Sequence, residues 1–275
     1  MKNTGKASKV LVFVLLSLLA LTTLVPILYM CEVTLLTKEE YMLNMFSLPS
    51  SFNLENYHVV LQNFNFVQMV FNSLMISTLT VVLSLFLTSL TAYSVDKLAW
   101  KGKKFVMALI TVGMFMPGQV LILPVYQILI SLNMVNNRLG LVTFYVALSI
   151  PFTVMMQRAN IHGISNEILE SASIDGAGHF RIYWSIVLPL LKPTLATAAI
   201  LNFITYWNEL LYAMILLQNE AYRTVTVSIV SMTNKFGSNP PLLYAGLLLS
   251  ALPVIVIYPV AQKQIIKGVS AGAVK

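Results

Sequence analysis

Long apolar stretches separated by short polar segments dominate this sequence. Six of the stretches are long enough to cross a hydrocarbon core of about 30 Å, which takes about 20 helical residues. They cover residues 10–30, 70–94, 105–131, 139–158, 193–217 and 242–262. The runs are continuous and lack the alternation of a barrel strand, and a helix satisfies its own backbone polar groups in lipid. The pattern therefore predicts an all-α integral membrane protein with about six transmembrane helices.

Composition supports a membrane location. Of 275 residues, 57% are hydrophobic and only 10% are charged, whereas soluble domains carry about 25% charged residues. A soluble fold would have too few polar groups to cover its surface. The net charge of +7 comes from short clusters between apolar stretches rather than from a basic stripe, so no nucleic acid is expected. Without an internal repeat or low-complexity tract, residues 1–275 are predicted to form a single transmembrane domain.

The first apolar stretch has two interpretations, a signal peptide or a retained helix. Lysines precede it, as in a signal peptide. Its apolar run of about 20 residues exceeds the roughly 7–15 residues of a signal peptide core. No small-x-small cleavage pattern follows it in residues 31–34. We therefore expect a retained helix.

The distribution of lysine and arginine predicts the orientation, because cytoplasmic loops carry an excess of these residues. Four lie on one side of the predicted spans: Lys38, Arg138, Arg223 and Lys235. The other side carries thirteen: Lys2, Lys6, Lys9, Lys97, Lys101, Lys103, Lys104, Arg158, Arg181, Lys192, Lys263, Lys267 and Lys275. Both termini and the loop 159–192 are thus predicted to be cytoplasmic, and the segment 31–66 faces outward.

The cytoplasmic loop 159–192 is patterned, and it predicts two short helices. Three features predict a helix near 166–175. Ser165 or Asn166 can cap its start, and Glu167 and Glu170 favour its first turn. Gly176 and Gly178 suit a left-handed stop at its end. A second helix is expected from about Phe180 to Val187, closed by Pro189. From the residues alone, the loop is either a structured surface segment or a docking element for a cytoplasmic partner.

A family resemblance favours the docking element. The residues that carry it are Glu170-Ser171-Ala172, Asp175-Gly176-Ala177, Tyr183, Ile186, Leu188 and Pro189. Their order and spacing resemble the EAA motif of ABC transporter permeases that act in import. Ser171 replaces the middle alanine of that motif, which exchanges one small residue for another.

Other segments resemble the carbohydrate-importing branch of this family, in which the smaller permease of the maltose importer is found. They are Asn72-Ser73, Pro117-Gly118, Pro124-Val125-Tyr126, Trp207-Asn208-Glu209 and the C-terminal residues 267–275. The resemblance extends over nearly the whole chain. It implies a binding-protein-dependent sugar importer in the bacterial plasma (inner) membrane.

The resemblance also implies partners. The chain would pair with a second, different permease, two ATP-binding subunits and an extracellular solute-binding protein. The coupling residues carried over from the motif are Glu170, Ser171, Ala172, Asp175, Gly176 and Ala177. The sequence contains no Gly-x-x-x-x-Gly-Lys-Ser/Thr phosphate-binding motif, so ATP is expected to bind to a partner. No cofactor is expected in this chain.

Polar residues in the fifth apolar stretch are candidates for a substrate path, because an ionisable group within a span is costly. Asn202, Thr205, Tyr206 and Glu209 follow at i, i+3, i+4 and i+7, which predicts one helix face. With Asn208, they could offer hydrogen bonds and an aromatic face to a sugar, although Glu209 would lie about 25 Å along the helix from the cytoplasmic end. Alternatively, Glu209 forms a helix–helix hydrogen bond or contacts the outer loops. Weaker candidates are Asn72, Gln119 and Gln127.

Three other functions remain as alternatives. One is an ABC importer for glycerol phosphate, amino acids or peptides, and another is an ion-driven secondary transporter that works without ATP. The third is a membrane enzyme. His58, His162 and His179 lack metal-ligand spacing and no catalytic group of residues is apparent, so no catalytic or metal site is expected.

Overall fold

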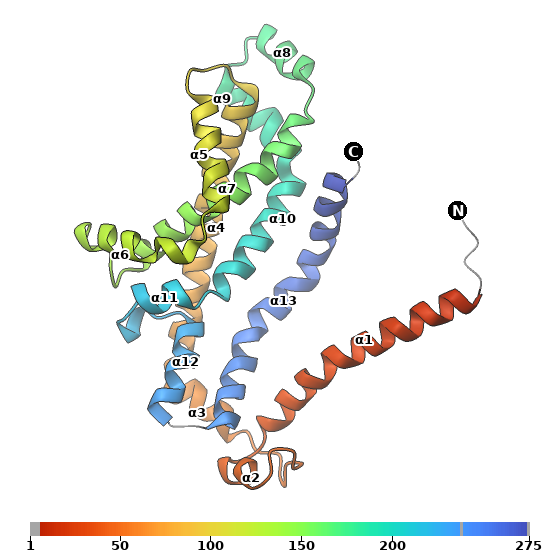
Figure 1. Ribbon diagram of the computed structural model, residues 1–275, viewed down its shortest axis with the longest axis vertical. Helices are drawn as coiled ribbons and strands as arrows, with labels where there is room; N and C mark the ends of the chain where they lie inside the picture. The colour runs from red at the N-terminus through yellow and green to blue at the C-terminus, as the bar shows by residue number, and fades with distance from the viewer. Residues whose placement is uncertain (1–5, 237–238, 274–275) are drawn as a thin grey trace. The chain divides into compact units, whose positions relative to one another are not determined.

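The computed structural model describes residues 6–236 and 239–273, and every secondary-structure element in these ranges is helical (Figure 1). Five long helices dominate: α1 (Lys6–Val33), α4 (Phe66–Lys97), α7 (Arg138–His162), α10 (Leu188–Trp207) and α13 (Pro240–Ala273). Lys2 and Lys275, two of the basic residues used to predict orientation, lie outside the described ranges.

Within the described residues, five helical segments are long and apolar enough to cross a membrane, or six if one bent pair counts as a span. The five are Ser8–Val33, Phe66–Lys97, Arg138–His162, His179–Trp207 and Pro240–Tyr258. The prediction of an all-helical membrane protein is confirmed. The first, second, fourth and sixth predicted spans each fall within one helix.

The third predicted span consists of two helical segments joined by a sharp bend, and the two together pass as one apolar span. α5 (Lys103–Phe115) ends before Pro117, and a 3-10 turn η1 (Gly118–Leu121) leads into α6 (Ile122–Ser131). The two segments are bent by 104°. The residue before a proline is pushed out of the helical region, and Met116 has extended angles, with φ −81° and ψ 118°. Pro117 therefore accounts for the break.

The fifth predicted span is wrong at both ends. The helix begins within the loop 159–192 with α9 (His179–Ile182), continues through a π-helical turn, η2 (Tyr183–Val187), and runs on as α10 to Trp207. The expected helix near 180–187 therefore does not stop at Pro189. Pro189 has no backbone N–H to donate, and it lies in the first turn of α10. The wider π-helical turn that precedes it accommodates the proline within a continuous helix.

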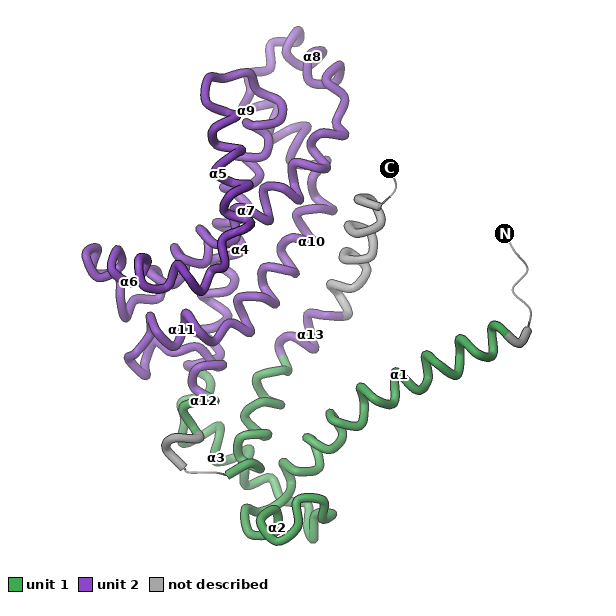
Figure 2. Tube along the Cα trace, viewed as in Figure 1, with its two compact units in different colours: residues 1–67, 229–252 green, residues 68–228, 253–275 purple. Residues whose placement is uncertain are grey.

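The chain divides into two compact units (Figure 2), residues 1–67 with 229–252 and residues 68–228 with 253–275. The predicted single domain stays a prediction. In the first unit, α2 (Lys38–Leu43) and α3 (Glu55–Asn63) follow α1. The amide of Asn56 donates to the carbonyl oxygens of Thr34 (2.9 Å) and Leu36 (2.8 Å), which holds α3 against the end of α1. Most of α1 is exposed, as suits a helix in lipid.

The second unit contains two apolar clusters. One joins α4, α6 and α7 with α11 (Leu211–Leu216) and the beginning of α12 (Val225–Phe236), and Tyr145 lies fully buried in it. Another 3-10 turn, η3 (Glu220–Tyr222), precedes α12. The other cluster joins α4, α5 and α7 with α8 (Asn166–Ile174), α9 and η2, around the buried Tyr183. This second cluster positions the loop 159–192.

Candidate functional site

The loop helix predicted near 166–175 is present as α8, and its N-terminus is capped as expected. The hydroxyl of Ser165 accepts a hydrogen bond from the backbone N–H of Glu167 at 3.2 Å. Glu167 lies in the first turn, where a negative charge is favourable beside the unpaired N–H groups. Ser165 is therefore the cap, rather than Asn166.

A left-handed glycine ends α8. Gly176 has a φ of +81°. The N–H of Ala177 donates to Ala172 O and that of Gly176 to Ser173 O, both at 3.0 Å, which is the pattern of a Schellman motif. Gly178, the other predicted stop, has a φ of −69° and instead precedes α9, so its prediction as a left-handed residue is wrong.

One face of α8 is buried and the opposite face is open. Leu169 is 9% exposed. Glu167, Glu170 and Ser171 are exposed, and Ile174 is 86% exposed. At 100° per residue these four share one face of the helix, opposite Leu169. This face of α8 thus presents two carboxylates and the side chain of Ile174 outward.

Gly176 also lies in open space. A Cβ added at this position would have no heavy atom within 4 Å. Packing within the chain therefore does not require a glycine here. The left-handed backbone does favour one, because other residues adopt this conformation at a cost of about 1–2 kcal/mol. Asp175 is exposed, and Ala172 and Ala177 are half-buried against the apolar cluster of the loop.

Polar contacts join α8 to the end of α4. The amine of Lys97 donates to the carbonyl oxygen of Ile164 (2.6 Å) and to Oδ1 of Asn166 (2.9 Å). The Lys97 side chain is only 7% exposed. The end of one transmembrane helix and the start of the loop helix are therefore linked directly.

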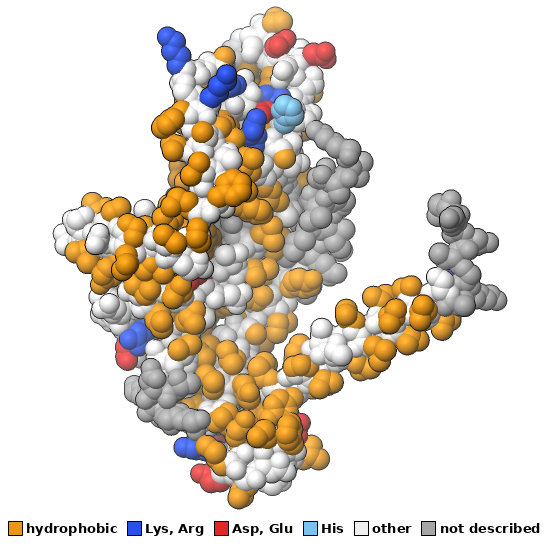
Figure 3. Space-filling view, in the orientation of Figure 1, with side chains coloured by type: hydrophobic (Ala, Val, Ile, Leu, Met, Phe, Trp, Pro, Cys, Tyr) orange, Lys and Arg blue, Asp and Glu red, His pale blue; other side chains and the backbone are white. Residues whose placement is uncertain are grey.

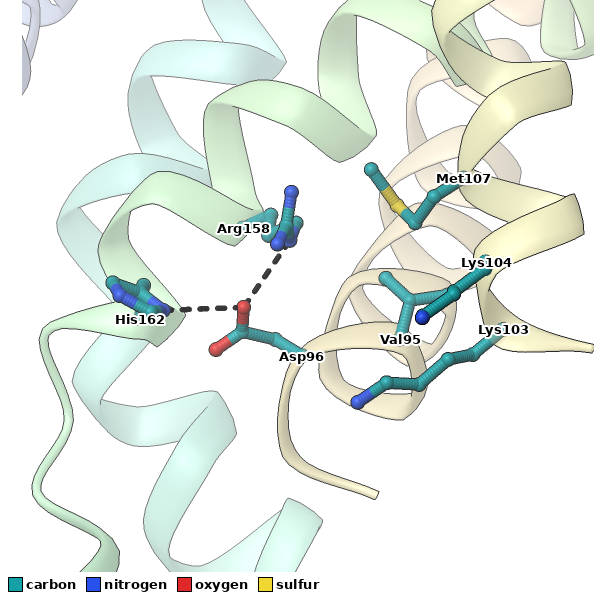
Figure 4. Close-up of a pocket in the computed structure, with 7 residues that line it drawn as sticks. All are labelled: Val95, Asp96, Lys103, Lys104, Met107, Arg158 and His162. Atoms are coloured by element: carbon teal, nitrogen blue, oxygen red, sulfur yellow. Dashed lines mark hydrogen bonds and ion pairs between the residues drawn. The ribbon is translucent and has the colours of Figure 1, made fainter. Parts of the chain in front are cut away.

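Asp96, beside Lys97, joins α4 to α7 (Figure 4). Its carboxylate, with a side chain 4% exposed, lies 3.1 Å from Nε of Arg158 and 3.3 Å from Nδ1 of His162. Both partners are on the last turns of α7. Two consecutive residues of α4 therefore contact different elements, Asp96 the end of α7 and Lys97 the start of α8.

In the same unit, two candidates for the substrate path on α10 are buried and hydrogen-bonded. Asn202 is 7% exposed, and its amide lies 3.4 Å from Oγ of Ser84 and 3.3 Å from Oγ1 of Thr153. Tyr206 is 6% exposed and donates to the carbonyl oxygen of Tyr145 at 2.9 Å. The rings of Tyr145 and Tyr206 stack with centroids 4.5 Å apart. These two side chains fix the packing of α10 against α4 and α7.

Glu209 lies beyond the end of α10, so the predicted helix face from 202 to 209 does not form. α10 ends at Trp207 with Asn208 as its C-cap. The Glu209 carboxylate accepts from the backbone N–H groups of Tyr212 (2.9 Å) and Ala213 (3.0 Å) and from the hydroxyl of Tyr145. It therefore caps α11 and ties it to α7.

The remaining path candidates differ in exposure. Asn208 is exposed, and its amide donates to Ile204 O at 2.9 Å. Asn72 is fully buried and donates to the carbonyl oxygens of Ala221 (3.0 Å) and Arg223 (2.9 Å). Gln119 and Gln127 are exposed on η1 and α6. Thr205 and Asn208 are thus the exposed polar residues of the Asn202–Glu209 segment.

Sequence reasoning missed the Asp96–Arg158 pair and a polar face on α4. Six small hydroxyl residues of α4 are buried: Ser89 and, at intervals of three or four residues, Ser73, Ser77, Thr80, Ser84 and Thr88. These intervals would have indicated one helix face. The pairing of Asp96 with Arg158 had no local signal, because 62 residues separate them. Among the described residues, no group of three His, Cys, Asp or Glu side chains could hold a metal ion.

Comparison with known proteins extends over nearly the whole chain. The family described as "Binding-protein-dependent transport system inner membrane component" matches residues 84–270. The probable ABC transporter permease protein YurM of Bacillus subtilis (strain 168) is 32% identical over 98% of this chain and 88% of that protein. The melibiose/raffinose/stachyose import permease protein MelC of the same organism is 28% identical, covering 100% of both chains.

Solved structures support the same fold. A chain of a bacterial ABC transporter involved in the import of the acidic polysaccharide alginate superposes with a TM-score of 0.82 and 25% identity. This match covers 96% of the present chain and 99% of the other. A second alginate transporter structure, in complex with an alginate-bound periplasmic protein, gives a TM-score of 0.65 at 18% identity, over 90% and 92% of the two chains.

Proposed function

Because this chain belongs to the inner membrane components of binding-protein-dependent ABC transport systems, we propose that it forms half of the transmembrane path of a sugar or oligosaccharide importer. It is a multi-pass permease subunit of an ABC importer. Its proposed partners are a second, different permease, two ATP-binding subunits and an extracellular solute-binding protein. In the proposed orientation, both termini and α8 lie in the cytoplasm.

The observation that carries this proposal is the open acidic face of α8. A helix of nine residues is marginal by itself in water. Here α8 is capped at both ends, anchored by Leu169 and exposed on its other face. Glu167, Glu170 and Ser171 are available to a partner, and we assign the coupling contact with an ATP-binding subunit to this face. Asp175, Gly176 and Ala177 complete the contact at the end of the helix.

The contacts of α8 give this coupling a route into the membrane. A displacement of α8 by an ATP-binding subunit would reach α4 through Lys97 and the Ile164–Asn166 segment. It would then reach α7 through Asp96 and Arg158. Leu169 adds a packing contact, because it lies in the same apolar cluster as residues of α4, α7 and η2. ATP hydrolysis would thus be converted into a relative movement of helix ends.

For the substrate path, we propose distinct roles for the four residues of the 202–209 segment. Asn208 is exposed and would contact the hydroxyl groups of a sugar. Asn202, Tyr206 and Glu209 would hold the wall of the path through their bonds to α4, α7 and α11. A wall fixed in this way would keep its polar groups oriented while the helix ends move.

A carbohydrate cargo is supported by the names of several similar proteins. AmyC of Thermoanaerobacterium thermosulfurigenes is a probable permease for starch degradation products and is 32% identical over 87% of both chains. The MelC and alginate transporter names also specify saccharides. An anionic saccharide is a second candidate, because the alginate transporter that superposes with a TM-score of 0.82 imports an acidic polysaccharide.

The proposal is tested by purifying the chain from its native membrane in mild detergent and identifying the accompanying proteins by mass spectrometry. We expect an ATPase with a phosphate-binding loop and a second permease. After reconstitution in vesicles, ATP hydrolysis should rise when sugar-loaded binding protein is added, but not with the unloaded form. Transport by the isolated chain without ATP would instead establish a secondary transporter.

A further inference from the structure

An open pocket of about 380 Å³ lies where the end of α4, the start of α5 and the end of α7 meet (Figure 4). Its lining consists of Val95, Asp96, Lys103, Lys104, Met107, Arg158 and His162. The pocket lies on the same side of the bundle as α8. None of these residues belongs to the coupling face of α8 or to the substrate path proposed above, whereas Asp96 and Arg158 also belong to the proposed coupling route.

The pocket carries a surplus of positive charge. Lys103, Lys104 and Arg158 contribute three cations against the single carboxylate of Asp96. With His162 neutral, two positive charges remain uncompensated. Asp96 is 4% exposed and pairs with Arg158 at 3.1 Å. Within the described residues, neither lysine has a carboxylate within ion-pair distance, and Lys103 makes a 3.3 Å hydrogen bond to Leu98 O.

The surroundings of the pocket have the features of a membrane interface. Trp100, in the turn between α4 and α5, is 39% exposed, and tryptophan is enriched at the level of lipid headgroups. Along α5, away from the turn, Phe105, Leu109 and Val112 are 67%, 55% and 56% exposed. Figure 3 shows basic side chains gathered toward the α8 and α9 end of this unit, with hydrophobic side chains beyond them. At 100° per residue the three apolar side chains of α5 lie about 120–180° around the helix from Lys103 and Met107, and Lys104 is the pocket residue of α5 nearest to them.

We propose that this pocket binds the phosphate headgroup of an anionic phospholipid from the cytoplasmic leaflet. Basic pockets between transmembrane helices on the cytoplasmic side suit such headgroups. Lys103, Lys104 and Arg158 supply charge-assisted donors to phosphate oxygens. The acyl chains lie along the exposed apolar side chains of α5. The cytoplasmic location rests on the proposed orientation.

The pocket suits an anionic phosphate group, which either inorganic phosphate or a phospholipid headgroup could supply. The position of the pocket favours the phospholipid. An inorganic phosphate would use the charges but leave the apolar side of α5 uncovered. A phospholipid uses both at once. The bound headgroup lies against Arg158, next to the Asp96 contact that links α4 to α7, so lipid binding stabilises the end of the bundle to which α8 is attached.

The test is native mass spectrometry of the purified, delipidated transporter complex titrated with phosphatidylglycerol, phosphatidylcholine or inorganic phosphate. The test variant is Lys103→Gln with Lys104→Gln. The matched control is Lys101→Gln with Lys192→Gln, which removes the same charge from exposed positions outside the pocket. Each lysine near an anionic surface strengthens binding about fivefold, so affinity for phosphatidylglycerol should fall about 25-fold in the test variant and change little in the control.

Each arm has a defined meaning. Selective loss of phosphatidylglycerol binding in the test variant supports the site. Equal binding by both variants, or equal binding of phosphatidylcholine, overturns it. Inorganic phosphate that binds with the same dependence on Lys103 and Lys104, without a lipid adduct, also overturns it. Because the readout is a lipid adduct and not uptake, failure here leaves the importer proposal intact, and failure of transport leaves the lipid site intact.

Discussion

The amine of Lys97 donates a 2.6 Å hydrogen bond to the carbonyl oxygen of Ile164, and so joins the end of α4 to the loop that enters α8. A lysine at the end of a span usually interacts with solvent or headgroups. Here its side chain is 7% exposed. Because Asp96 precedes it and pairs with α7, two consecutive residues connect α8, α4 and α7.

Replacing Lys97 with methionine should weaken coupling between α8 and the membrane helices. Methionine keeps much of the apolar stem but cannot donate to Ile164 or Asn166, and hydrogen bonds to charged groups contribute about 1.5–3 kcal/mol each. We expect ATP hydrolysis stimulated by binding protein to fall several-fold while the complex still assembles. The measurement is ATPase activity in reconstituted vesicles, with Lys101→Met as the exposed control. Equal activity in both variants would contradict the proposed route.

Replacing Asp96 with asparagine should destabilise the end of the bundle. It removes the only carboxylate paired with Arg158 among the described residues. Because the Arg158 side chain is 37% exposed, solvent compensates in part, and we expect a loss of about 1–2 kcal/mol rather than the 3–5 kcal/mol of a fully buried pair. Thermal unfolding of the solubilised complex, in a double-mutant cycle with Arg158→Met, gives the coupling energy. Additive effects would show that the pair is not coupled.

Substitutions of Gly176 distinguish a requirement for its left-handed backbone from a requirement for close contact with a partner subunit. Asparagine tolerates a left-handed conformation, and the open space around Gly176 allows a side chain. Gly176→Asn should therefore leave the isolated chain as stable as the wild type. If an ATP-binding subunit packs closely against this position, both Gly176→Asn and Gly176→Asp should abolish most uptake. Normal uptake by Gly176→Asp would refute a docking role for this residue.

Replacing Glu209 with glutamine should destabilise the contact between α10, α11 and α7. The carboxylate accepts from two backbone N–H groups and one hydroxyl. The NH₂ group of glutamine would face a donor at one of these positions, and an unsatisfied buried donor costs about 1–3 kcal/mol. The midpoint of thermal unfolding should fall, whereas Glu220→Gln, with a side chain 74% exposed, should change it little. Unchanged stability with a raised KM would instead favour direct substrate contact.

Replacing Asn208 with alanine should affect transport and leave stability nearly unchanged. Asn208 is exposed, and its amide makes a local hydrogen bond to Ile204 O. Losing one hydrogen bond to a sugar, of about 1 kcal/mol, would raise the KM for uptake about fivefold. Sugar uptake and thermal unfolding are measured on the same preparation. A large fall in stability with an unchanged KM would assign Asn208 to the structure.

The sequence by itself determined the features that depend on local physical chemistry. Long uncharged runs required helices in lipid, because the backbone has no other hydrogen-bond partners there. A serine cap, early glutamates and a glycine stop were sufficient for α8, since these residues act within one helical turn. The family could also be identified, because the spacing from Glu170 to Pro189 is contained in one segment.

The tertiary structure decided where helices end and which polar groups meet. The fifth predicted span was extended past Trp207 on apolar content alone, whereas Glu209 caps α11 and bonds to Tyr145, a residue of another helix. Likewise, Asp96 meets Arg158 only after α4 and α7 pack, although 62 residues separate them. Such contacts depend on how helices approach one another, and hydrophobic periodicity specifies which face of a helix is buried, not which helix covers it.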